Sequence, residues 1–175
     1  MANTDAPNGF RPYRGSANGN PKIGYHVLNT TNSALGVGTV VAIVAGGTDV
    51  WASGALLGIA AEAKAANAGG TASTKMLAVW DDPEQEFTAQ TDNGTGTSTA
   101  EAAVGLNIDI LNPSSVTSGR STSELDETSA TTTATLPLKI LGLESRPDNA
   151  FGEFNRLVVK INNHQLKGGT GTAGV

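Results

Sequence analysis

Few residues in this sequence have side chains and neighbours suited to catalysis. His26 and His164 are the two histidines, so a Ser-His-Asp arrangement would have to use one of them. The nucleophile-elbow, zinc-protease and phosphate-loop motifs are absent. His26 lies within an alternating segment and His164 follows two asparagines, positions that favour surface or capping roles. We therefore predict no enzymatic activity, no catalytic residue and no cofactor.

The densest acidic cluster contains Asp81, Asp82, Glu84 and Glu86. Carboxylate oxygens are ligands that Ca²⁺ prefers, so a bound ion is one interpretation. The cluster lacks the ligand spacing of known calcium loops, and its Asp-Asp-Pro segment is typical of a turn. We predict a solvated hairpin turn and no metal site, and the sequence leaves open whether Asp81 and Asp82 bind an ion.

Trp51 and Trp80 stand out because aromatic residues make up only 5% of the chain. Large aromatic side chains most simply fill a core or anchor an interface. A carbohydrate-binding adhesion module is the alternative, in which one of these tryptophans would be exposed beside polar loops and stack on a sugar.

Composition narrows the fold class and the partners. The chain has 175 residues, which suits one domain, and combines 15% charged residues with 22 glycines and no cysteine. Its turn formers and β-branched residues favour an all-β fold. The formal net charge is −5, and Arg11 with Arg14 is the nearest approach to a basic cluster. We therefore predict no nucleic-acid partner.

Neither the apolar runs nor the opening segment indicates a membrane protein. The longest runs, residues 39–45 and 55–61, are far shorter than the ~20 residues of a membrane-spanning helix. Residues 1–12 are polar and contain Asp5 and two prolines, unlike a signal peptide. We expect a soluble protein that is made in the cytoplasm and has no membrane partner.

Eight short segments have the alternating or continuous apolar pattern of β-strands. They are residues 23–28, 40–44, 56–61, 76–80, 86–91, 107–111, 136–143 and 157–162.

The first of these segments alternates Ile23, Tyr25 and Val27 with less apolar residues, which predicts a half-buried strand. In residues 56–61, glycine and alanine indicate close approach of another backbone segment.

One short helix is expected, with Ser98 as its cap, Glu101 reaching back and Gly105 ending it. Residues 116–135 are compatible with strand, turn or loop. The sequence thus predicts an all-β domain, a small antiparallel β-barrel or sandwich of about eight short strands with one short helix. It does not decide between barrel and sandwich.

The β domain is expected to span residues 22–166, between an extended arm (1–21) and a flexible Gly/Thr-rich tail (167–175). Three prolines exclude a helix from the arm. Its contact-forming side chains are Phe10, Arg11, Tyr13 and Arg14, residue types enriched at interfaces. We predict that they bind a neighbouring subunit or a capsid, and that the domain folds without residues 2–20. The alternative is a disordered terminus.

A series of turn and strand-end segments runs along the chain. It comprises residues 1–12 (MANTDAPNGFRP), residues 57–60 (LGIA), Asp81-Asp82-Pro83 followed by Phe87 and residues 90–92, Gly119-Arg120-Ser121 with Glu124-Leu125, residues 138–150 and residues 162–165. In this order the series resembles a family of virion structural proteins of tailed bacteriophages. The resemblance covers nearly the whole chain, and its motifs carry no chemistry.

The resemblance implies a capsid decoration (cement) protein that binds the outer surface of the major capsid protein lattice and stabilises the head. Decoration proteins of similar kind commonly form trimers at three-fold positions, so we expect a homotrimer on the capsid exterior of the virion. Another virion component, such as a tail or head-fibre protein, is an alternative.

Overall fold

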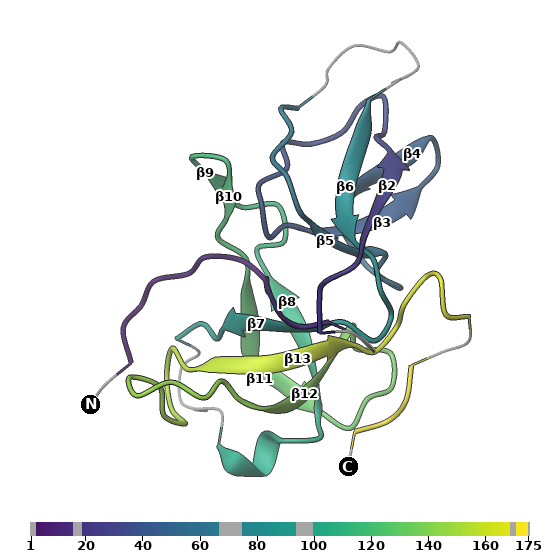
Figure 1. Ribbon diagram of the computed structural model, residues 1–175. Coiled ribbons are helices and arrows are strands. Elements are labelled where there is room, and N and C mark those ends of the chain that lie inside the picture. The colour runs from purple at the N-terminus through teal and green to yellow at the C-terminus, as the bar shows by residue number, and fades with distance from the viewer. Residues whose placement is uncertain (1–2, 16–18, 67–74, 94–99, 169–170, 175) are drawn as a thin grey trace.

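The computed structural model describes residues 3–15, 19–66, 75–93, 100–168 and 171–174. These residues form thirteen β-strands and a single 3₁₀ turn, so the predicted all-β class is confirmed. The strands build three antiparallel sheets. Figure 1 shows the two larger sheets as an upper and a lower lobe, and the fold is sandwich-like rather than a closed barrel. Within the described part of the chain, no helix is long and apolar enough to cross a membrane.

The lower lobe is a six-stranded sheet in the order β1-β7-β13-β12-β8-β11. The pair β7–β13 keeps an unbroken register, whereas the central pair β13–β12 and both edge pairs, β1–β7 and β8–β11, contain register shifts. The strand bounds are β1 Arg11–Arg14, β7 Glu86–Gln90, β8 Asn107–Leu111, β11 Glu124–Thr131, β12 Leu138–Leu143 and β13 Arg156–Ile161.

The upper lobe is a curled five-stranded sheet in the order β2-β6-β5-β3-β4. Its two edges meet at one point, where Leu28 bridges Thr48 and the Asn29 N–H donates to the Thr48 carbonyl (2.9 Å). The bounds are β2 Ile23–Val27, β3 Val40–Val44, β4 Gly47–Val50, β5 Gly58–Ala60 and β6 Met76–Trp80. A third, two-stranded sheet consists of β9 Val116–Thr117 and β10 Arg120–Ser121.

The centre of the upper sheet, at β5 and the first residues of β3, is buried on both faces, which explains the continuous apolar runs of these strands. Val40 and Ile59 face the larger core, which they share with the lower sheet. Val41 and Ala60 point the opposite way, into a second cluster inside the upper lobe. At Gly58 a side chain would overlap the carbonyl oxygen of Trp80, so the close backbone approach predicted for residues 56–61 is confirmed.

All eight predicted strands are present, as β2, β3, β5, β6, β7, β8, β12 and β13. The expected total of about eight is nevertheless too low. The ambiguous residues 116–135 form β9, β10 and β11, and Gly46 and Gly47, both at positive φ, turn the chain from β3 into β4. The remaining strand that the pattern missed is β1.

The predicted short helix is reduced to a 3₁₀ turn at Glu101–Ala103, preceded by Ala100 without a side-chain cap. The expected cap, Ser98, lies outside the described residues. The helical conformation ends at Val104, whose backbone is extended, one residue before the predicted Gly105, which has φ of 94°.

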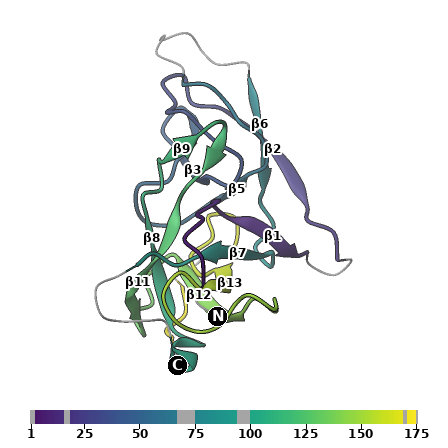
Figure 2. The same ribbon diagram turned by 90° about the vertical axis from the view of Figure 1, so that its left-hand side faces the viewer.

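The prediction that residues 1–21 leave the domain body is wrong for residues 10–14. Phe10 is fully buried in the larger core, and its N–H donates to the Gly38 carbonyl (3.0 Å). Residues Arg11–Arg14 form β1, which lies beside β7 in the lower sheet (Figure 2). The prolines do prevent a helix, but Pro12 is tolerated because β1 is an edge strand.

The predicted flexible tail is also attached to the domain where the structure describes it. The Thr172 N–H donates to Asn162 Oδ1 (2.9 Å), and the Thr172 carbonyl accepts from the Asn107 side chain (2.7 Å). The Gly174 N–H donates to the Thr132 carbonyl (3.1 Å). Residues 171–174 therefore lie along the lower sheet.

Candidate interaction surface

Two of the four contact residues predicted in the N-terminal arm lie largely inside the protein. Phe10 is inaccessible to a partner because it fills the core. Arg11 is partly buried, and burial, followed by repulsion from Arg120 and Arg156, lowers the pKa of its guanidinium. Neither side chain presents an open contact surface.

Tyr13 and Arg14 lie nearer the surface. The Arg14 guanidinium stands over the Tyr13 ring, 5.1 Å from its centroid, in a cation–π contact. Tyr13 is partly buried and Arg14 is exposed. Their contact with a capsid or another subunit stays a prediction, and it now rests on this pair alone.

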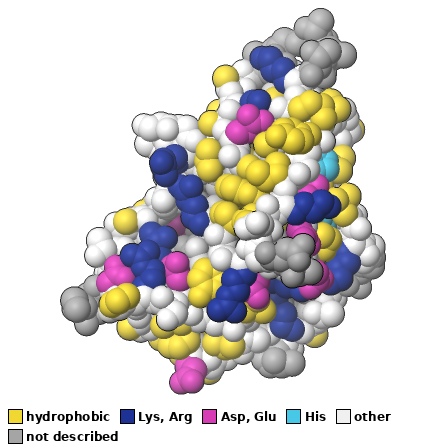
Figure 3. Space-filling model, in the orientation of Figure 1, with side chains coloured by type: hydrophobic (Ala, Val, Ile, Leu, Met, Phe, Trp, Pro, Cys, Tyr) yellow, Lys and Arg dark blue, Asp and Glu magenta, His cyan; other side chains and the backbone are white. Residues whose placement is uncertain are grey.

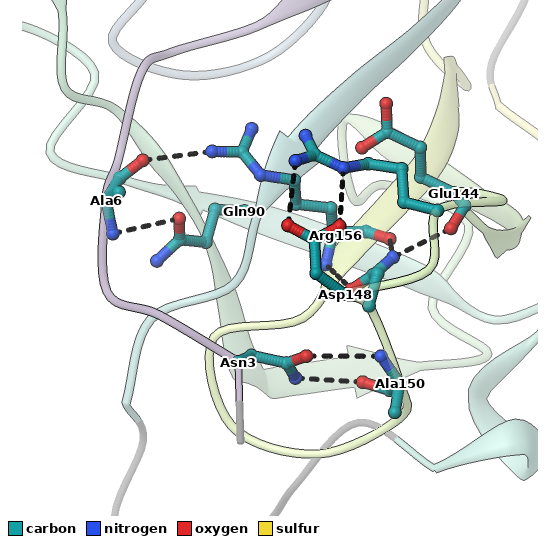
Figure 4. Close-up of polar contacts among 9 residues, drawn as sticks. Asn3, Ala6, Gln90, Glu144, Asp148, Ala150 and Arg156 are labelled. Atoms are coloured by element: carbon teal, nitrogen blue, oxygen red, sulfur yellow. Dashed lines mark hydrogen bonds and ion pairs between the residues drawn. The ribbon is translucent and has the colours of Figure 1, made fainter. Parts of the chain in front are cut away.

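The first described residues form a strap, Asn3 to Ala6, that is bonded to the domain itself (Figure 4). The Asn3 side chain donates to the Ala150 carbonyl (2.9 Å) and accepts from the Ala150 N–H (3.1 Å). The Ala6 N–H donates to Gln90 Oε1 (3.2 Å), and its carbonyl accepts from Arg156 (3.0 Å). The strap thereby fixes the β12–β13 connection.

A pocket of about 110 Å³ lies under this strap. Its charged groups bond to each other, since Arg146 donates two hydrogen bonds to Asp148 (3.1 and 3.0 Å). Asn149 donates to the carbonyls of Glu144 (2.9 Å) and Arg156 (2.8 Å). The pocket is small and its polar groups are occupied, so we interpret it as part of the strap's anchorage.

Glu124, at the start of β11, is a carboxyl group with a raised pKa. Burial raises its pKa to about 7, and the negative charges of Asp5 and Asp92 add to the rise. Because Asp5 belongs to the strap, ionisation of Glu124 places repelling charges between strap and domain.

Each of the two histidines has a hydrogen-bond partner within the domain. His26 Nε2 lies 2.8 Å from Asp81 Oδ2, in a pair that is mostly shielded from solvent. Gly24 makes room for it, because a side chain there would overlap the Asp81 carboxylate. The bond joins β2 to the residue that follows β6, so it acts as a structural link within the upper lobe.

His164 is buried at the end of β13, where it bridges Leu56. Its Nδ1 accepts the Leu166 N–H (3.1 Å), which requires the unprotonated nitrogen. Burial lowers the pKa of His164, although the nearby charges of Asp81 and Asp82 oppose the shift. The capping role predicted for this residue agrees with its bond to Leu166.

The acidic cluster after β6 forms a turn in which Asp81, Asp82 and Glu84 have separate partners. Asp82 Oδ1 accepts the Glu84 N–H (2.9 Å), and the Asp82 carbonyl accepts the Gln85 N–H (3.0 Å). Glu84 pairs with Lys160 and Lys167, which lower its pKa to about 2. Among the described residues, no group of three or more acidic or histidine side chains is arranged to hold a metal ion.

The tryptophans do not offer a sugar-stacking face. Trp51 is only 6% exposed, belongs to the larger core and donates its indole N–H to the Gly54 carbonyl (3.0 Å). Trp80 is partly buried against the same core. A hollow of about 390 Å³ beside Trp51 is lined by this residue together with Asp49 and Pro113, among others.

The most extensive exposed apolar surface on one sheet lies along β2, on the outside of the upper lobe. We call it the β2 stripe, and it consists of Ile23, Tyr25 and Val27 with Met76 of β6, which pairs with Val27. Their exposed fractions are 45%, 68%, 50% and 41%. Figure 3 shows hydrophobic side chains gathered over this part of the upper lobe.

The sequence predicted the alternation of this strand correctly but not which side is covered. The intermediate residues Gly24 and His26 face the side of Leu77 and Val79, while the apolar residues face outward. Periodicity alone identifies two faces and cannot tell which one packs.

Comparisons with known proteins found no matching family model, no matching curated protein and no matching solved structure.

Proposed function

We propose that this protein is a capsid decoration protein of a tailed phage, which binds the outer surface of the major capsid protein lattice and stabilises the head. The β2 stripe carries the proposal, because contiguous exposed apolar surface on a folded domain marks a site of protein contact. The motif resemblance along the chain supports a capsid as the partner. The core position of Trp51 argues against the adhesion-module alternative.

One stripe is a small contact. From the exposed fractions of its four side chains, it offers roughly 300–400 Å² of apolar area, whereas a stable interface needs about 800 Å² on each partner. A single copy should therefore bind weakly. Several copies joined in one oligomer bind a repeating lattice far more tightly, because each bound copy raises the local concentration of the others.

This reasoning supports a homotrimer, which would present three stripes in cyclic symmetry to three-fold positions of a lattice. Native mass spectrometry of the purified protein measures the assembly directly. A stable monomer at tens of micromolar, which also fails to assemble on capsids, contradicts the proposal.

The location of the protein tests the function. Particles that lack the protein are incubated with gold-labelled protein and imaged by electron microscopy. We expect label at regular positions on the head and greater resistance of decorated heads to heat or low salt. Label on the tail or on fibres would favour a different virion component, and absence of label would refute virion attachment.

A further inference from the structure

We propose that β2 is a docking edge, where an extended segment of the capsid lattice protein pairs with residues 23–25 and adds a sixth strand to the upper sheet. The identity of the partner rests on the proposed function. The mode of binding rests on the edge itself, which differs from the other edges of the two larger sheets.

The other edge strands have features that prevent pairing with a further strand. β1 contains Pro12 and a register shift, and β11 contains a register shift and the carboxylate of Asp126. β4 carries Asp49 and is bridged by Leu28 through Thr48. β2 has an unbroken register with β6 and contains no proline, lysine or acidic residue.

The backbone of β2 is oriented to accept a strand. The Leu28 N–H donates to the Lys75 carbonyl (3.0 Å), and this pair continues the β2–β6 register. Hydrogen-bonded and non-hydrogen-bonded pairs alternate in antiparallel sheets, so Gly24 and His26 bond to β6 and Ile23 and Tyr25 direct their backbone groups outward. Beyond Tyr25 this outward side meets β4, where Leu28 bridges Thr48 and the Asn29 N–H donates to the Thr48 carbonyl (2.9 Å). Among the described residues, no strand pairs with the outward side of Ile23 and Tyr25.

Charge and area favour a foreign strand over a second copy. Exposed Lys22 and Lys75 lie at opposite ends of the β2 stripe. If two β2 strands paired antiparallel about Tyr25, Lys22 of one copy and Lys75 of the other would lie in one row across the sheet, about two strand spacings apart. The stripe is also too small for a stable dimer. An extended segment with alternating apolar residues and an acidic residue near Lys22 suits the backbone and the stripe.

The test uses heads purified from particles that lack this protein, and measures binding of the full-length chain by co-sedimentation. Ile23→Pro removes an outward N–H at the first residue of an edge strand, where proline is tolerated, and Ile23→Thr is its matched control. We expect Ile23→Pro to bind about ten-fold more weakly or worse, because each copy in an oligomer loses a hydrogen bond. Ile23→Thr should stay within about three-fold of the wild type, since it keeps the backbone donor.

A second pair of variants covers the case in which Ile23→Pro fails to fold. Tyr25→Lys places a charge in the middle of the edge and should abolish binding, whereas Leu141→Lys, on β12 of the other sheet, should not change it. If the wild type binds heads and the folded edge variants bind them with the same affinity, strand addition is refuted but the proposed function is not. If the edge variants change the mass of the protein's own oligomer and leave head binding unchanged, the occupant of the edge is a second copy. Absence of wild-type binding refutes both proposals.

Discussion

Replacing Phe10 tests whether the N-terminal segment is part of the folded core. Its ring is fully buried among residues of both sheets, so Phe10→Ala removes the whole ring and leaves a cavity. Such substitutions cost about 3–5 kcal/mol. With a urea dependence of about 2 kcal/mol per molar, the unfolding midpoint should fall by about 2 M. Circular dichroism across a urea titration measures the shift.

Two controls separate core packing from a general effect on the segment. Thr4→Ala, at an exposed position of the strap, should change stability by less than about 0.5 kcal/mol. Phe10→Leu refills much of the space and should lose less than about 2 kcal/mol. If Phe10→Ala unfolds at the same urea concentration as the wild type, the segment is a passive terminus and its placement in the core is refuted. Deletion of residues 2–20, which the sequence alone predicts to leave a folded domain that binds capsids more weakly, should then also leave the domain folded.

Three further substitutions test the electrostatics and packing. Folded Glu124 keeps its proton up to about pH 7 while the unfolded chain loses it near pH 4.5; the wild type therefore loses stability as pH rises through this window. Glu124→Gln should be more stable by about 1–2 kcal/mol at pH 8 after allowance for solvent screening, and equal at pH 4, in thermal unfolding. The lowered pKa of His164 means that the unfolded state takes up a proton first as pH falls below 6.5. The stability difference between the wild type and His164→Gln should therefore shrink between pH 7.5 and 5 in urea titrations, and a constant difference would contradict the assignment. Gly58→Ala must displace the Trp80 backbone and should cost about 2 kcal/mol or more, whereas Gly142→Ala, with open space around it, should be nearly neutral in the same assay.

The sequence predicted the strands well because their patterns are local. Residues 40–44 and 157–161 are apolar, β-branched and bounded by turn formers, and they form β3 and β13. Gly58 indicated a close contact because a glycine inside a strand often marks a bend or the approach of another backbone segment. These signals depend on neighbours within a few residues, so they predict the strands independently of the tertiary arrangement.

The placement of β1 could not be predicted in the same way. The segment has three prolines around it and pairs with β7, more than seventy residues away in the sequence. A strand with proline at its second position has low intrinsic propensity, and its stability comes from Phe10 in the core and from pairing with a distant partner. The sequence correctly indicated that Phe10 is buried in a contact. It did not show that the contact lies within the same chain.

The β2 stripe shows a related limit, with a consequence for function. An alternating strand is expected to bury its apolar side, and burial of roughly 300–400 Å² is worth about 8–10 kcal/mol at 25 cal/mol per Å² as an upper estimate. The fold forgoes this stabilisation because β2 is the last strand of its sheet and its outer face extends beyond the contact with the lower lobe. The same edge lacks the proline, bulge or charge that guards the others. One strand of five residues thus combines exposed apolar side chains with an unguarded backbone edge. This combination is expected where a partner completes both the apolar contact and the backbone pairing.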